Sequence, residues 1–191
     1  MSKYYVVYDS TGAVVTRYDS DINADLIANP PAGLSLLEVP DKATMLQTRE
    51  PGWTVKTGAL VSPTAAQLLA QAQAAQIAII TQACAAAITS GFISSALGSA
   101  HTYPSGLTDQ ANLAANVLSS LLPGLPSTWT TPQLCQDANG VWAYVAHTAA
   151  QIQQVGSDGK AAILGYLTKK ASLQAEIEAA TTVASVNAIV W

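Results

Sequence analysis

The stretch that decides the fold is Ser62–Ser90, SPTAAQLLAQAQAAQIAIITQACAAAITS. No Gly or Pro occurs between Thr64 and Ser90, and Ala, Leu and Gln are good helix formers. Ser62 is suited to the N-cap and Pro63 to the first helical position. The sequence therefore predicts one long helix, roughly 40 Å in length at about 1.5 Å per residue.

The apolar side chains of this helix form two neighbouring stripes at helical spacing. The eight residues are Leu68, Ala72, Ala75, Ile77, Ile79, Ile80, Cys84 and Ile88. Two apolar stripes bordered by small Ala residues are typical of a helix that contacts more than one neighbour, as in a bundle or a short coiled coil. We interpret these residues as an oligomer interface. The alternative is that the helix packs only on its own chain.

The region before the helix, residues 1–62, has the pattern of a small β-module. KYYVVYDSTGAVVTRY (3–18) alternates on both sides of a turn and predicts a β-hairpin. LSLLEV (34–39) predicts a strand after the NPPAG loop (29–33), and WTVKTGALV (53–61) predicts a second hairpin.

The region after the helix, residues 91–191, has mostly helical patterns. Thr108 is a candidate N-cap for a helix that ends at Pro123 and Gly124, and LPSTWTTP (125–132) is expected to be a loop. LCQDANGVWAYV (134–145) predicts a hairpin that turns at Asn-Gly.

A last helix is predicted from His147 to about Ala180, which Gly156 and Gly159 interrupt or weaken. The predicted fold class is thus α+β, mainly α. It has an N-terminal β-module (1–62), a connecting helix (63–90) and a C-terminal helical domain (91–191) with one β-hairpin.

Composition excludes some classes of function. The chain of 191 residues has a formal net charge of −4 and only 10% charged residues. Nucleic-acid binding needs clustered Lys and Arg, which this chain lacks. We find no basic-then-apolar leader, and we expect no membrane span because no uninterrupted run of 18 apolar residues occurs. Such low charge is typical of a surface that neighbouring subunits partly cover.

Catalytic and metal-binding patterns are weak, so we predict no enzyme activity, no cofactor and no metal site. His101 and Asp109 lie eight residues apart, but no nucleophile motif accompanies them. A catalytic His101 is the minor alternative to a hydrogen-bonded corner histidine. Cys84 and Cys135 are interpreted as buried free thiols, with a disulfide as the alternative.

The four tryptophans carry two interpretations. They are Trp53, Trp129, Trp142 and Trp191. Buried anchors in small β-layers are favoured, and stacking against a sugar is the alternative.

Three stretches carry a family resemblance: CAAAITSGFISSALGSAHTYPSGLTDQANL (84–113), WTTPQLCQDANGVWAYVAHTAAQIQQV (129–155) and KKASLQAEIEAATTVASVNAIVW (169–191). Together they resemble phage and prophage tail-associated proteins with a DUF4376 domain, over roughly residues 70–191. We interpret the most distinctive residues as a structural corner between two helices. They are Gly91, Phe92, Gly98, His101, Tyr103, Asp109, Gln110 and Asn112. The N-terminal β-pattern is similar to modules that open tail-fibre and tail-fibre-assembly proteins.

The resemblance implies a structural component of a bacteriophage tail, a tail fibre or fibre-attachment subunit that serves virion assembly and host attachment. It implies a virion protein made in the host cytoplasm. The implied partners are further copies in a homotrimer, other tail or baseplate proteins, and a host surface glycan or receptor. The alternatives are a tail-fibre assembly chaperone that does not remain in the virion and, less favoured, a tail glycan hydrolase.

Overall fold

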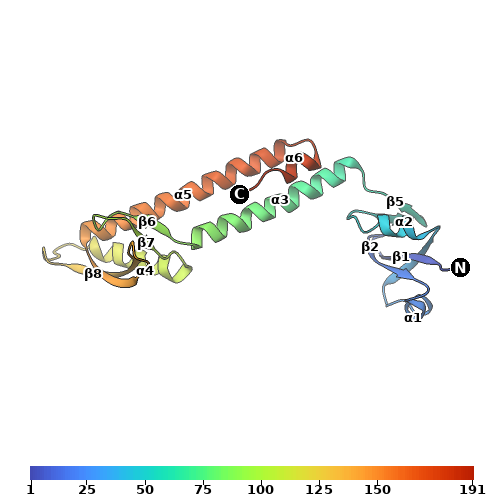
Figure 1. Ribbon diagram of the computed structural model, residues 1–191, viewed down its shortest axis with the longest axis horizontal. Coiled ribbons are helices and arrows are strands. Elements are labelled where there is room, and N and C mark those ends of the chain that lie inside the picture. The colour runs from blue at the N-terminus through green and yellow to red at the C-terminus, as the bar shows by residue number, and fades with distance from the viewer. The chain divides into compact units, whose positions relative to one another are not determined.

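The computed structural model describes residues 1–191, and the chain divides into two compact units (Figure 1). One unit comprises Met1–Gln73 with Thr181–Val183, and the other comprises Ala74–Ala180 with Ala184–Trp191. We call them the N-terminal unit and the C-terminal unit.

The N-terminal unit is built around a three-stranded antiparallel sheet of order β2-β1-β3. Its strands are β1 (Tyr4–Asp9), β2 (Val14–Asp19) and β3 (Leu34–Val39). Strands β4 (Thr54–Lys56) and β5 (Ala59–Val61) form the second hairpin. The two hairpins and the third strand confirm the predictions from alternating sequence.

Two short helices of this unit were not predicted. They are α1 (Ala24–Ala28) and α2 (Lys42–Gln47), five and six residues long. So short a segment carries too little periodicity to distinguish it from a loop. The Asp41 carboxylate caps α2 by accepting a hydrogen bond from the Thr44 amide at 2.7 Å.

Gly12 joins the two hairpins through a close approach of backbones. The Val55 amide donates to the Gly12 carbonyl at 2.7 Å, and Ala13 forms a bridge with Thr54. Gly12 has a φ of +84°, and a Cβ at this position would lie 2.3 Å from the Val55 carbonyl oxygen. Only glycine fits the site without displacement of the backbone.

The long helix is α3 (Ala65–Thr89), which confirms the prediction from sequence. It is capped by Thr64 and not by Ser62: the Thr64 hydroxyl accepts from the Gln67 amide and the Gln67 side chain accepts from the Thr64 amide. By length and composition alone α3 is apolar enough to cross a membrane, with 17% of its most apolar window buried. The expectation of no membrane span rested on a different criterion, an uninterrupted run of 18 apolar residues, which α3 does not contain because Gln and Thr interrupt it.

The C-terminal unit contains a four-stranded antiparallel sheet of order β6-β7-β8-β9. Its strands are β6 (Phe92–Ser94), β7 (His101–Tyr103), β8 (Thr130–Gln136) and β9 (Trp142–Thr148). Its helices besides α3 are α4 (Leu107–Ser120), α5 (Ala149–Ala179) and α6 (Val183–Asn187).

The prediction of a mainly α fold with one hairpin in the C-terminal part was wrong. The chain is 45% helix and 24% strand, with six helices and three sheets, which is a balanced α+β fold. Two causes are visible in the C-terminal unit. Strands β6 and β7 have only three residues each, too few to show alternation. Strand β8 includes Thr130–Pro132, which Pro132 made resemble a loop.

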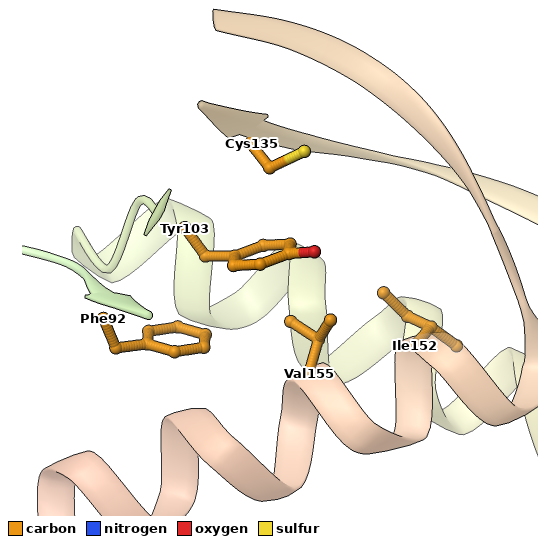
Figure 2. Packing of buried hydrophobic residues seen from close by; sticks show 5 residues of the cluster. All are labelled: Phe92, Tyr103, Cys135, Ile152 and Val155. Carbon is orange, nitrogen blue, oxygen red and sulfur yellow. The ribbon is translucent and has the colours of Figure 1, made fainter. Parts of the chain in front are cut away.

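Helix α5 runs unbroken for 31 residues past Gly156 and Gly159. A Cβ on Gly159 would lie 2.8 Å from Cζ of Phe92, and one on Gly156 would lie 2.8 Å from a methyl group of Val117. These glycines therefore allow β6 and α4 to approach α5 closely. The buried cluster here contains Phe92, Tyr103, Cys135, Ile152 and Val155 (Figure 2).

Within the C-terminal unit, α3 from residue 74 onward, α5 and the C-terminal segment pack as a helical arm (Figure 1). Ile80, Ile177 and Val186 are fully buried in it. The Gln76 side chain donates to the Ile189 carbonyl at 2.5 Å, and Trp191 packs against the ring of Tyr166. The C-terminal segment is therefore held on the helices.

Candidate functional site

The corner between α3 and α4 contains most of the residues that drew attention in the sequence. Gly91 has a φ of +108°, and a Cβ there would lie 2.8 Å from the Tyr103 carbonyl oxygen, so glycine is required where β6 and β7 pair. The rings of Phe92 and Tyr103 stack on each other (Figure 2), and their centroids lie 5.6 Å apart. Gly98, with a φ of +90°, forms the turn between these strands.

His101 and Asp109 are each engaged in separate local contacts. Nδ1 of His101 lies 2.9 Å from the Ser99 carbonyl oxygen. The Asp109 carboxylate accepts from the Gly106 amide at 3.1 Å, at the start of α4. Gly106, and not Thr108, is the N-cap, since α4 begins two residues earlier than predicted. The Gln110 side chain donates to the Ser105 carbonyl at 2.9 Å.

The sheet interior holds a buried polar pair that the sequence did not reveal. The hydroxyl of Tyr103 lies 2.8 Å from Nε2 of His147, and Nδ1 of His147 lies 2.8 Å from the Val145 carbonyl oxygen. A carbonyl only accepts, so Nδ1 carries the proton and Nε2 accepts from the tyrosine. Both side chains are fully buried. The two residues are 44 positions apart, and pairing of β7 with β8 and of β8 with β9 brings them together.

Burial governs the protonation of this pair and of the neighbouring thiol. Burial lowers the pKa of His147, because the charged imidazolium is poorly solvated there. Burial also raises the pKa of Tyr103 and that of the Cys135 thiol. All three side chains are thus held neutral near pH 7. The arrangement acts as an internal structural bond and has no open face toward a substrate.

An apolar cavity of about 480 Å³ lies between α4 and α5. Its lining is mostly apolar, with Lys160 as the only charged residue; apolar members include Leu113, Val117, Leu118, Leu121 and Ile163. Leu118 and Leu121 are more than half exposed. The cavity therefore opens beside an apolar patch on the end of α4.

A second, polar cavity of about 200 Å³ lies between α4 and strands β8 and β9. Its polar lining residues are Asp109, Asn112, Asn116, Gln133 and Tyr144. Asp109 and Asn112, which the sequence placed in the corner, thus face a shared cavity with residues of the hairpin. No pattern along the chain indicated that these residues meet, since the α4 and hairpin residues are distant in sequence.

The predicted oligomer interface is divided by the fold. Ile80 and Cys84 are buried against the rest of their own chain, and Ile77 and Ile88 are partly buried. These four residues form one of the two stripes. In the other stripe, Ala75 and Ile79 are exposed, whereas Leu68 and Ala72 are partly buried. One stripe therefore packs within the chain, and part of the other stays free.

The structure also shows how far the cysteines and tryptophans are buried. Cys84 and Cys135 are both buried and free, so the disulfide alternative is excluded in this structure. No tryptophan is fully buried, and Trp142 is 46% exposed on β9. No group of three or more His, Cys, Asp or Glu side chains is arranged to hold a metal ion.

Comparison with protein families matches residues 71–190 to "Domain of unknown function (DUF4376)". The chain belongs to the DUF4376 family. The match covers well over half of the chain and agrees with the extent predicted from the sequence. No curated protein and no solved structure matches the chain. The DUF4376 region contains the whole sheet of the C-terminal unit, the corner and both cavities, while the β-module lies outside it.

Proposed function

We propose that this DUF4376 protein is a structural subunit of a bacteriophage tail, a tail fibre or fibre-attachment subunit, which assembles through its helical arm. The tail assignment rests on the sequence resemblance described above. The observation that favours an assembling subunit is the apolar surface left open on the arm. Within the most apolar window of α3 only 17% of the residues are buried by the chain itself.

The open surface includes large side chains from both helices of the arm. Ile79 on α3 is 54% exposed, and Leu164 and Leu167 on α5 are 50% and 41% exposed. Single exposed apolar residues are ordinary, but α3 carries no charged residue, and only Gln and Thr side chains separate its exposed Ala residues and Ile79. Burial between copies would remove this surface from solvent, and we propose a homotrimer as the assembled form.

Light scattering on the recombinant full chain tests the assembly. A mass of three times 19.7 kDa supports the trimer, and a mass near 19.7 kDa at high concentration contradicts self-association. Ile79→Glu together with Leu164→Glu should dissociate the oligomer, since each places a charge in an apolar interface. Thr81→Glu is the matched control, because Thr81 is an exposed polar residue of the same helix.

Mass spectrometry of purified phage particles tests the role in the tail. Stoichiometric presence of the protein in tails supports the proposal. Presence in the infected cell but absence from particles would instead identify an assembly chaperone.

A further inference from the structure

We propose that the polar cavity between α4 and the β8–β9 hairpin binds one neutral sugar unit of a glycan. Its floor, wall and rim come from three different elements and supply three kinds of contact. Gln133 lies at the floor, Asp109 and Asn112 form the α4 wall, and Tyr144 stands at the rim.

The floor presents an amide donor that no protein group uses. Gln133 is 5% exposed, and its side-chain oxygen accepts from the Asn116 amide at 3.0 Å. The Asn116 orientation is fixed, because its amide nitrogen also donates to the Pro132 carbonyl at 3.3 Å and a carbonyl can only accept. Nε2 of Gln133 therefore has no hydrogen-bond acceptor within the protein. Every fully buried side-chain nitrogen or oxygen does have a partner, so Nε2 is not fully buried. That nitrogen is therefore accessible, and the cavity is where a ligand would reach it.

The wall supplies both acceptors and donors, one helical turn apart on α4. The Asp109 carboxylate uses one oxygen to accept from the Gly106 amide, which leaves the other oxygen without a protein donor. The exposed Asn112 side chain makes no hydrogen bond to the protein and can both donate and accept. A hydroxyl group also donates and accepts, so adjacent hydroxyls on one ring match this set.

The rim supplies a flat apolar surface. Tyr144 is 73% exposed on β9, with a ring that combines an apolar face and a hydroxyl. The C–H face of a pyranose ring can stack on such a surface while its hydroxyls reach the amides. Trp142, two residues earlier on the same face of β9, is 46% exposed and does not line the cavity.

The charge and the volume of this cavity restrict which ligands it can bind. Asp109 is the only charged residue that lines the cavity, so anionic sugars and phosphates meet repulsion with no cation to offset it. The volume of about 200 Å³ is below the range of about 300–1,000 Å³ for drug-sized ligands. A single neutral sugar unit at a chain end fits both limits. That this glycan is a host receptor rests on the proposed tail function, whereas sugar binding by itself does not.

Side-chain amide NMR on the ¹⁵N-labelled full chain is the direct test, with glucose, galactose and N-acetylglucosamine as neutral probes and glucuronate as the anionic comparator. We expect a neutral probe to shift the side-chain NH₂ signals of Gln133 and Asn112. Asn112→Ala and Tyr144→Ala should each weaken binding by about tenfold, the loss expected for one hydrogen bond or one stacking contact. Both residues are exposed, so the fold should persist.

Trp142→Ala is the matched control, because it removes an exposed aromatic ring of the same strand that lies outside the cavity. Unchanged affinity in this variant supports the cavity as the site. The proposal is overturned if no neutral probe at millimolar concentration shifts the two amides. It is equally overturned if glucuronate binds as well as the neutral sugars, or if binding survives both cavity substitutions. None of these results depends on whether the protein is found in phage particles.

Discussion

The cores of the two units are built from different chemistry. The buried cluster of the N-terminal unit, Val6, Val39, Met45 and Val55, is entirely aliphatic. The cluster of the C-terminal unit includes Tyr103 and Cys135, and His147 is buried beside it. An aliphatic core needs only the right volume, whereas a core with polar groups needs each group to find its partner. The two units should therefore respond differently to small chemical changes.

The N-terminal unit depends instead on backbone geometry at Gly12. We expect Gly12→Ala to lower the free energy of unfolding of this unit by about 2–4 kcal/mol, because backbone strain adds to the displacement of Val55. Gly33→Ala is the control: its φ of +82° is nearly the same as that of Gly12, but nothing lies within 4 Å of the added methyl group. It should cost about 1 kcal/mol. Urea unfolding followed through the amide signals of β1 and β2 measures both, and equal losses would refute the role of the close approach.

A matched pair of tyrosines compares the two cores directly. Tyr103→Phe leaves Nε2 of His147 buried without a donor and should cost about 1–3 kcal/mol. Tyr18 is also buried, 7% exposed, but makes no side-chain hydrogen bond within the protein. Tyr18→Phe should stay within about 0.5 kcal/mol of the parent. Urea midpoints of the two variants decide the matter, and a similar small effect in both would mean that the buried pair contributes little.

Acidification should weaken the C-terminal unit through His147, with the smallest of these effects. Burial lowers the pKa of His147 in the folded protein below the usual value of 6.5. As the pH falls through about 6.5, His147 takes up a proton in the unfolded chain but stays neutral in the folded protein. The free energy of unfolding is therefore highest above this pH and falls below it. Urea unfolding at about pH 7.5, 6.5 and 5.5 measures the slope. His147→Gln should flatten it, and a gain in stability on acidification would contradict the assignment.

Sequence reasoning succeeded where a pattern extends over many residues or where turn residues are specific. The 25-residue helix α3 and the Asn139-Gly140 hairpin are of this kind. It failed on β6 and β7, whose three residues each are held in strands by pairing with each other and, for β7, with the distant strand β8. It also expected Gly156 and Gly159 to interrupt or weaken α5, because glycine has a low helix propensity. Propensity takes no account of the side chains of Val117 and Phe92, which pack where a Cβ would lie.

The candidate site was only half predictable for a related reason. Asp109 and Asn112 attracted attention as a dense polar stretch, and their places at the start of α4 follow from local capping chemistry. Tyr144 was predicted only as part of a hairpin, and Gln133, which directly precedes that hairpin, drew no prediction of its own. Alternation along a strand tells which residues share a face but not what lies opposite that face.

The sequence by itself determined the long helices, the hairpins and membership of the DUF4376 family, because local propensity, turn chemistry and motif spacing are written along the chain. Only the tertiary structure decided which side chains meet. It buried Tyr103 against His147, buried Ile80 but left Ile79 exposed, and placed Asp109 and Gln133 in the lining of one cavity. Such meetings depend on packing between elements far apart in sequence, and no local pattern specifies them.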